Sequence, residues 1–449
     1  MSGHAGHGTL LTGWGRTAPS RADVLTPRSE DEVVSLVTTL RPRGLVARGL
    51  GRSYGDAAQN AGGAVIDMTE LKGITDFDEQ AGRIRALAGT SLAEIIPAAL
   101  ARGWFLPVSP GTRHVTVGGA IASDIHGKNH HVEGTFGSHV TSLSLACPSK
   151  GRIELSPDGK PAPFWATVGG MGLTGVILEA EFDLIPAASS EVLVDTDRAE
   201  DLDSLMALLA AEAGHRYSVA WVDCLATGRH LGRGLSLRGD HAPEPAASEP
   251  VRAYSPPRSI EVPPIVPGGL LNRWTVRAFN EAYFRAAPMK ERGKRASVTS
   301  FFHPLDAIGG WNNAYGPRGF IQYQCVVPTG AETSIRWILE TLAAEKQPTF
   351  LAVLKRFGPR NPGPLSFPIE GWTLAFDCPA GSPGLRQVLD RLDERVAEVG
   401  GRVYLTKDAR LRPEMLEAMY PELTEWRAVR AELDPDGALG SDLSHRLSL

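Results

Sequence analysis

Three histidines gather in a stretch otherwise made of small residues. Residues 115–131 read VTVGGAIASDIHGKNHH, which places His126, His130 and His131 within six positions. His126 and His130 have the i, i+4 spacing of helical zinc ligands, but the glycines on both sides oppose a rigid helix, and no HExxH-type general base accompanies them. We therefore expect no metal ion here. Two interpretations remain open: a cluster of structural histidines, or one wall of a cofactor site.

Two glycine-rich stretches have the composition of nucleotide-binding loops. GGMGLTG, at 169–175, contains GxGxxG spacing, yet the following VILEAEFDLI alternates like a strand, whereas a dinucleotide fingerprint must open a helix. RGLGRSYGDAA, at 48–58, follows an expected strand, and its glycines leave backbone N–H groups that form an anion-binding nest. The sequence therefore predicts a pyrophosphate loop at 48–58 and no Rossmann fingerprint near 170.

Hydrophobic periodicity divides the chain into two kinds of unit. In the first, 44–49 and 63–69 read as buried strands and 91–103 as a helix. The later part carries helices and strands at 201–215, 217–225, 319–327, 334–345, 350–358, 371–379 and 384–400. An antiparallel sheet with helices on one side fits this second unit, so we predict an α+β fold.

A proline-rich segment interrupts the second unit. Residues 241–269 hold eight prolines and few core-forming residues, so the segment cannot propagate a helix or a central strand. We interpret the part near 240–268 as a mobile loop over or beside the site, with an inert linker as the alternative.

Composition excludes several classes of protein. The 449 residues carry a net charge of −5 without a run of Lys or Arg, which speaks against a nucleic-acid partner. The four cysteines form no CxxC pair, so no zinc knuckle or disulfide framework is indicated. We expect no signal peptide or transmembrane helix, at most peripheral membrane contact, and a cytoplasmic or membrane-associated location, with the periplasmic side open.

Three motifs together resemble the flavin domain of the vanillyl-alcohol-oxidase (PCMH-type) superfamily. They are the loop near residue 50, SPGTRHVTVGGAIASDIHG at 109–127 and GMGLTGVILEA at 170–180. The resemblance implies an FAD-binding domain of two subdomains, in which small residues let the backbone approach the dinucleotide. Many members tether the flavin through a histidine in the first loop, where this chain has Tyr54. We therefore expect FAD to be bound non-covalently.

A closer resemblance covers nearly the whole chain. GWGRT, ARGLGRSYGDAAQN, GGAIASDIHGKNHH, GFIQYQ, LSFPIEGW, YLTKDAR, MYPELTEW and DPDGALGSDLSHRL are similar to the decaprenylphosphoryl-β-D-ribose 2-oxidases, the flavin half of an actinobacterial epimerase pair. This implies that the chain oxidises the ribose 2-hydroxyl to a ketone. A separate NADH-dependent keto-reductase would then reduce the ketone, and the two steps together lead to arabinose for cell-wall arabinan. A quinone or another acceptor would reoxidise the flavin. The alternatives are an FAD-dependent oxidase of another sugar, alditol or aldonolactone, and a flavin-free protein that binds metal at the histidines.

The resemblance also implies domain boundaries. It places an FAD-binding domain at 1–190, a substrate-binding domain at 191–401, and a C-terminal segment at 402–449 that returns to the FAD domain.

Site residues follow from the same resemblance. Lys407 is expected to stabilise charge on the reduced flavin, and either His126 or Tyr54 to act on the substrate hydroxyl. The residues expected at FAD are Arg48, Gly49, Gly51, Arg52, Ser53, Tyr54, Gly55, Pro110, Gly111, Thr112, Thr116, Gly119, Ala122, Ser123, Ile125, His126, Gly127, Thr174, Val176, Tyr404 and Lys407. The residues expected at the substrate are Lys128, Trp221, Gln322, Gln324, Lys355, Thr373 and Ala375.

Strand alternation supports the substrate residues independently. Gln322 and Gln324 share one face of their strand, and Thr373, Ala375 and Asp377 share one face of theirs. Mycobacterial members of the family carry a cysteine where this chain has Ala375. The nearest cysteine lies three residues further on, so it should point to the opposite face.

The first prediction concerns the attachment of FAD. Because a tyrosine stands where related proteins carry the tethering histidine, denaturation by acid or heat should release the flavin into the supernatant. Absorbance spectra of supernatant and pellet measure this. Yellow colour that stays with the denatured protein would contradict the interpretation.

Overall fold

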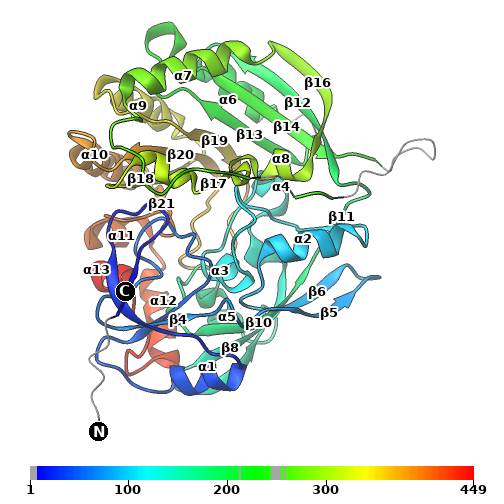
Figure 1. The fold of residues 1–449 in the computed structure, drawn as a ribbon, viewed down its shortest axis with the longest axis vertical. Helices are drawn as coiled ribbons and strands as arrows, with labels where there is room; N and C mark the ends of the chain where they lie inside the picture. Colours follow the sequence, from blue (N-terminus) through cyan, green and yellow to red (C-terminus); the bar gives the residue numbers. More distant parts are fainter. Residues whose placement is uncertain (1–7, 212–213, 244–253, 257–258) are drawn as a thin grey trace.

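The chain folds into two stacked halves. The computed structural model describes residues 8–211, 214–243, 254–256 and 259–449. In Figure 1 the first two fifths of the chain form the lower half with two small sheets, and a large sheet fills the upper half. The last helices of the chain return beside the lower half.

The first small sheet has four strands and carries the glycine-rich loop. Its strands, in spatial order, are β1 (Thr9–Leu11), β2 (Ser20–Leu25), β4 (Ala64–Asp67) and β3 (Leu45–Arg48). β2 and β3 both pair in parallel with β4, which is buried along most of its length. The expected strands at 44–49 and 63–69 are confirmed, and the loop at 48–58 starts directly from the end of β3.

The second small sheet is antiparallel and has five strands. They are, in order, β5 (Ile74–Asp78), β6 (Arg83–Leu87), β10 (Val176–Asp183), β8 (Val140–Cys147) and β9 (Gly151–Leu155), and a short pair joins β7 (Trp104–Phe105) to β11 (Ile185–Pro186). A strand at β10 confirms that the GxGxxG spacing before it opens no helix. The helices of this half are α1 (Glu30–Val37), α2 (Leu92–Leu100), α3 (Val117–Ala122), α4 (His130–Glu133) and α5 (Pro161–Thr167).

The large sheet has eight strands, each antiparallel to its neighbours. In order they are β16 (Lys290–Ser297), β12 (Glu191–Ala199), β14 (Gly234–His241), β13 (Tyr217–Val222), β19 (Ala352–Phe357), β20 (Gly371–Pro379), β18 (Phe320–Pro328) and β21 (Arg402–Val403). The predicted antiparallel sheet is therefore confirmed.

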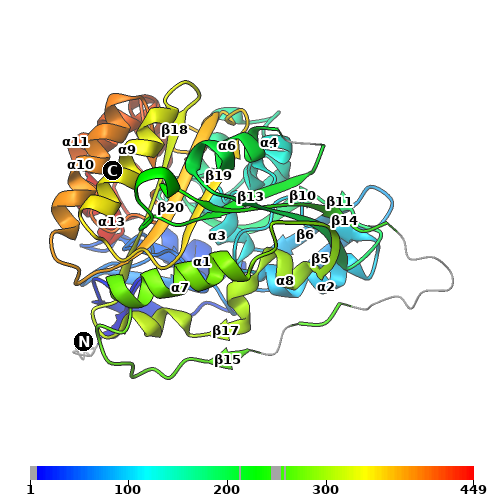
Figure 2. The same ribbon diagram turned by 90° about the horizontal axis from the view of Figure 1, so that it is seen from above.

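Helices cover both faces of this sheet, which corrects the expectation of helices on one side. α6 (Leu202–Ala210), α9 (Glu332–Ala344) and α10 (Leu385–Glu398) lie on one face, and α7 (Arg273–Ala286) lies on the other (Figure 2). Because alternate residues of a strand point to opposite faces, Ala220 packs with the first group while Trp221 packs with Phe284 of α7. The polar face of β18–β20 is thus the α7 side.

The C-terminal segment joins both halves. After β21 come α11 (Pro413–Met419), α12 (Leu423–Leu433) and α13 (Asp442–Leu447). Leu439 bridges to Leu45 at the start of β3, and Trp426 donates a hydrogen bond to the Ala166 carbonyl in the lower half. The backbone of Tyr54 donates to the Thr406 carbonyl, so the glycine-rich loop is fixed against this segment.

No helix carries both His126 and His130, as the glycines around His126 predicted, although a short helix, α3, forms before them and contains Gly118 and Gly119. α3 is capped by Thr116, whose side chain accepts from the Gly119 N–H. A Cβ at Gly118 would lie 3.0 Å from the Cβ of Ala88, so this glycine serves close packing. The helix ends at Ala122, and His126 therefore does not share a helix with His130 of α4.

The proline-rich segment is only partly described. Residues 244–253 and 257–258, which belong to the predicted mobile loop, lie outside the described part of the chain. Within the same segment, β15 (Ile260–Glu261) pairs in parallel with β17 (Ile308–Gly309), and α8 (Val298–Phe302) follows β16.

Gly55 packs directly against the backbone of the C-terminal segment. A Cβ there would lie 1.7 Å from the Asp408 carbonyl oxygen, which belongs to the backbone and cannot turn away. Gly55→Ala should lower the free energy of unfolding by about 3 kcal/mol, as overpacking does at rigid contacts. Urea denaturation measures it, with Gly268→Ala, where the nearest atom is 4.0 Å away, as control. Equal midpoints for both variants would show that the two segments are not tightly packed.

Candidate active site

Three loops from distant parts of the sequence meet under the polar face of the large sheet. A Cβ at Gly49 would lie 2.3 Å from Oγ1 of Thr116, so the 48–55 loop touches the start of α3. Tyr404 donates a hydrogen bond of 2.7 Å to the Ser123 carbonyl at the end of α3. With the Tyr54–Thr406 bond, these contacts bring together the first loop, the α3 region and the segment after β21.

The arginines of the first loop have different surroundings. Arg48 donates to the carbonyls of Ala58 and Thr12, so its side chain braces the loop. The guanidinium of Arg52 lies 3.9 Å from the ring centre of Trp14. Its Nε atom is buried without a hydrogen-bond partner among the described residues. Arg52 is therefore the arginine of this loop whose polar atoms remain available to a ligand.

The polar side chains of the large sheet form one continuous patch. Strand register places Trp221 opposite Val353, Val353 opposite Ala375, and Ala375 opposite Gln324. In the adjacent row, Lys355 lies opposite Thr373. Five predicted substrate residues and one apolar neighbour, Val353, thus share a single face, as strand alternation predicted for the residues of β18 and β20.

Cys378 points away from this patch. It is fully buried in the cluster that contains Leu374 and Phe376, on the side of α9 and α10. The prediction that this thiol faces away from Ala375 is confirmed. Among the described residues all four cysteines are buried and unpaired.

His126 joins the loops to the sheet. Its Nε2 lies 2.9 Å from Nε2 of Gln324, and its Nδ1 lies 3.0 Å from Nζ of Lys355. The ring is enclosed by Phe357, Phe367 and Tyr404. Desolvation, reinforced by the nearby Lys355, lowers the pKa of His126 well below its usual value, so the imidazole is neutral at pH 7.

The hydrogens between His126 and its neighbours Gln324 and Lys355 follow from which groups must donate. Gln324 donates one amide hydrogen to Oγ1 of Thr373 and the other to Nε2 of His126. A neutral imidazole carries one hydrogen, which then resides on Nδ1. Lys355 accepts it as an uncharged amine, in agreement with a pKa that burial lowers to about 7. His126 and Lys355 therefore form a neutral pair.

Two further lysines share this environment. Lys407 lies with its Nζ 3.6 Å from the ring centre of Tyr54. Lys128 donates to the carbonyls of Phe301 and Phe302. Burial lowers the pKa of each to about 7, yet part of each side chain still borders open space. Both amines therefore lie in weakly solvated surroundings and still remain partly accessible to a ligand.

Asp377 is a site residue that the predicted set omits. It accepts from Gln322 at 2.6 Å and from the Tyr315 hydroxyl at 3.2 Å. Burial raises its pKa to about 7, while Lys407 opposes that shift. The signal in the sequence was its alternation with Thr373 and Ala375, which places it on the same face.

Some predicted residues lie at the margin of this arrangement. Thr174 is fully buried and hydrogen-bonded to Thr167, and the side chain of Val176 is buried in the core, so only their backbone can face a ligand. Trp221 contacts Tyr283 of α7 at 5.0 Å between ring centres, at the far end of the patch. His130 accepts from the Gly358 N–H, and no group of three metal-ligating side chains exists among the described residues.

The residues of the three loops suit an FAD molecule. A Cβ at Gly111 would meet nothing within 4 Å, so the backbone of the second loop is open to a ligand at this exposed glycine. Nε of Arg52 and Nη1 of Arg113 are buried without partners in the described chain, which suits a pyrophosphate. The amines of Lys128, Lys355 and Lys407 suit the negative charge of a reduced flavin. The residues present therefore fit the group that the sequence motifs imply.

Comparison with known proteins agrees with this geometry. The FAD binding domain family matches residues 22–156, and the D-arabinono-1,4-lactone oxidase family matches residues 381–447. The chain is 44% identical to the decaprenylphosphoryl-β-D-ribose oxidase of Mycolicibacterium smegmatis over 98% of its own length and 97% of the relative. It belongs to the decaprenylphosphoryl-β-D-ribose oxidase family.

More distant relatives share the general chemistry. An alditol oxidase of a Streptomyces species is 25% identical over 96% of both chains, and the D-arabinono-1,4-lactone oxidase of Eremothecium gossypii is 29% identical over 36% of this chain. As a member of the decaprenylphosphoryl-β-D-ribose oxidase family the chain is an FAD-dependent oxidoreductase. In its described part, no helix has both the length and the apolar character to cross a bilayer.

The pKa of Lys407 gives a prediction on stability. In the unfolded chain this lysine titrates at its ordinary value of 10.5, but in the fold at about 7, so folding at neutral pH disfavours its proton. Lys407→Met should raise the free energy of unfolding of the FAD-free protein at pH 7 by at least about 1 kcal/mol. The gain should shrink as pH rises toward 10.5, because the unfolded lysine then also loses its proton.

Urea denaturation at several pH values measures this difference. Lys72→Met serves as control, since the side chain of Lys72 is 52% exposed. A gain for Lys407→Met that is absent at pH 7, or that grows with pH, would contradict burial of this amine.

Proposed function

We propose that the chain oxidises the ribose 2-hydroxyl of decaprenylphosphoryl-β-D-ribose to a ketone, with FAD bound non-covalently. The observation that carries this proposal is the neutral His126–Lys355 pair on the polar face of the sheet, beside the three loops whose residues suit FAD. Family membership supports the substrate, because the mycobacterial relative is named for this lipid-linked sugar. The bound FAD would supply a two-electron acceptor for the hydrogen that leaves the sugar carbon.

The first and second loops would hold the cofactor. Arg52 and Arg113, with their unpartnered nitrogens, are positioned for its phosphates. Gly49 and Gly55 let the loop pack against Thr116 and Asp408 without side chains in between. Tyr54 has no chemistry for a histidine-type link, and burial raises its pKa, so it stays a neutral phenol.

His126 is the better candidate for the base. A base must be unprotonated before the reaction, and desolvation keeps this imidazole neutral. Tyr54 would need to lose a proton that burial stabilises on its oxygen. We therefore propose that the substrate hydroxyl replaces the Gln324 amide at Nε2 of His126 and gives its proton to that nitrogen, while Lys355 at Nδ1 shares the resulting positive charge.

Lys407 would stabilise negative charge that develops beside it. The charge of Asp377 acts on its amine, and burial brings the pKa of each of these two groups to about 7. An added negative charge would favour the protonated form of Lys407. Its proximity to Tyr54 keeps the amine in one position.

The remaining partners follow from the chemistry of the product. A 2-keto sugar must be reduced from the other face to give the epimer, so we propose an NADH-dependent keto-reductase as the next enzyme. The reduced cofactor needs an acceptor, for which a quinone is our proposal. An FAD-dependent oxidase of another sugar or an alditol remains the alternative, and distant similarity to an alditol oxidase is the observation behind it.

Substitution of Lys407 provides the test. Lys407→Ala should keep bound FAD but reduce the rate of anaerobic flavin bleaching by prenylphosphoryl ribose by about 10²–10³, since solvent cannot replace a preorganised cation. Lys72→Ala, on the exposed surface, should bleach like the unmodified protein. If an alditol but not the prenylphosphoryl sugar bleaches the flavin of the unmodified protein, the proposed substrate is wrong. If Lys407→Ala bleaches at the unmodified rate, the proposed role of Lys407 is wrong.

A further inference from the structure

Exposed apolar side chains are concentrated in one part of the chain. Of the thirteen large hydrophobic residues that are exposed in the described part of the chain, eight lie between residues 260 and 308: Ile260, Ile265, Leu270, Trp274, Phe279, Tyr283, Met289 and Ile308. They belong to α7 and its flanking segments, on the side of the large sheet opposite α6, α9 and α10 (Figure 2). Water is an unfavourable environment for so much clustered apolar surface.

α7 is held rigidly, so its exposed face is a fixed surface. Its inner side buries Val276, Asn280 and Phe284, spaced one turn apart. Asn280 donates to the buried carboxylate of Asp223, and Glu281 accepts from Arg233. The outer side leaves Trp274 64% exposed, and apolar exposure on a well-anchored helix indicates that this surface has a partner.

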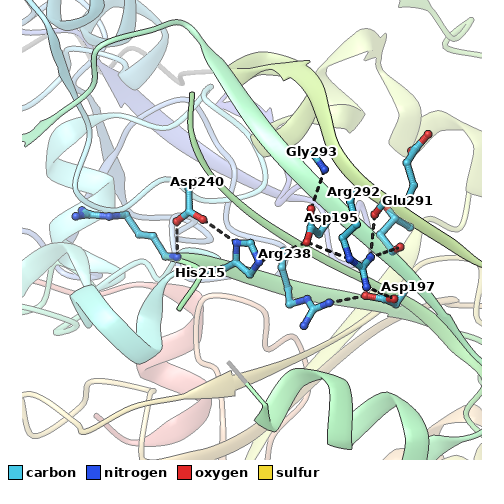
Figure 3. A network of polar contacts seen from close by, with 10 residues as sticks. Asp195, Asp197, His215, Arg238, Asp240, Glu291, Arg292 and Gly293 are labelled. Carbon is cyan, nitrogen blue, oxygen red and sulfur yellow. Dashed lines mark hydrogen bonds and ion pairs between the residues drawn. The ribbon is translucent and has the colours of Figure 1, made fainter. Parts of the chain in front are cut away.

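The same segment is basic in an acidic protein. Residues 270–297 contain seven Lys and Arg and two Asp and Glu, whereas the whole chain has a net charge of −5. The inner cations are neutralised by β12: Arg292 of β16 pairs with Asp195 at 3.4 Å and with Asp197 at 2.7 Å (Figure 3). Figure 3 also shows Arg238 hydrogen-bonded to Asp197, so both carboxylates already pair with arginines of the sheet.

The outer cations of this segment have no such partners. Arg273, Arg277 and Lys290 are exposed, and none of them has an acidic partner among the described residues. Arg273 lies 4.2 Å from the ring centre of Trp274, so a cation and an aromatic ring project together from the first turn of α7. Aromatic and basic side chains side by side are typical of helices at a lipid interface.

The outer face of α7 is continuous with the polar patch of the sheet. Tyr283 contacts Trp221 at 5.0 Å, and Trp221 stands in the row of Val353, Ala375 and Gln324. A lipid whose head group reaches that patch would therefore extend its apolar chain past α7. We propose that α7 and its flanks, residues 260–290, dock on the surface of an anionic lipid bilayer. This deepens the proposed function, because it places the patch next to the phase in which a prenylated substrate resides.

Vesicle binding by the whole FAD-loaded protein, without substrate, tests the proposal. The protein should co-sediment with vesicles of phosphatidylcholine mixed with phosphatidylglycerol, and less with phosphatidylcholine alone. Leu270→Ala/Trp274→Ala and Arg273→Glu/Arg277→Glu should each weaken binding to the mixed vesicles by about tenfold. High salt should weaken it as well, since exposed charges are screened.

Matched controls lie at the opposite end of the molecule, near α1 (Figure 1). Leu40→Ala removes a side chain that is 63% exposed, and Arg28→Glu reverses an exposed charge; both should bind like the unmodified protein. Absence of binding to mixed vesicles, or equal binding by the α7 variants and the controls, would overturn the docking surface. Because no substrate is present, this outcome is distinct from failure of the proposed oxidation, which flavin bleaching by detergent-dispersed substrate reports.

Discussion

The rest of the site depends on the burial of His126 between the two halves of the molecule. Its ring is supplied by the loop after α3, whereas the side chains that contact its two nitrogens come from β18 and β19 of the large sheet. A buried imidazole without a carboxylate stays neutral, and a neutral ring has one hydrogen to share between two nitrogen partners. The register of the sheet against the loop therefore sets which nitrogen can accept a proton from a ligand.

The same burial governs the lysines around the ring. Desolvation lowers the pKa of Lys128, Lys355 and Lys407 to about 7, so each amine is poised between its charged and neutral forms. Without a counter-charge such amines oppose folding, because each would be better solvated in water. Negative charge brought by a cofactor or a sugar phosphate removes that cost. The site is thus built to hold its ligands at some expense in stability, as functional sites often are.

Much of this arrangement could be predicted from the sequence, for identifiable reasons. Strand alternation placed Gln322 with Gln324 and Thr373 with Ala375, because the period of two is fixed by backbone geometry. The FAD-binding domain and the family could be predicted because several sequence motifs resemble those of known proteins. Local patterns could not show that α7 covers the second face of the sheet, since its inner stripe is short and contains Asn280. Nor could they show α3, whose Gly118 is explained by close contact with Ala88, a residue remote in sequence.

The central claim is that hydrogen leaves carbon 2 of a prenylphosphoryl ribose while His126 takes the hydroxyl proton. The most direct measurement is the anaerobic rate of flavin bleaching with substrate that carries deuterium at carbon 2, compared with deuterium at carbon 3. The account predicts that deuterium at carbon 2 slows bleaching and that deuterium at carbon 3 leaves the rate unchanged. Equal rates for both labelled sugars and the unlabelled one, or slowing by the carbon 3 label alone, would contradict it.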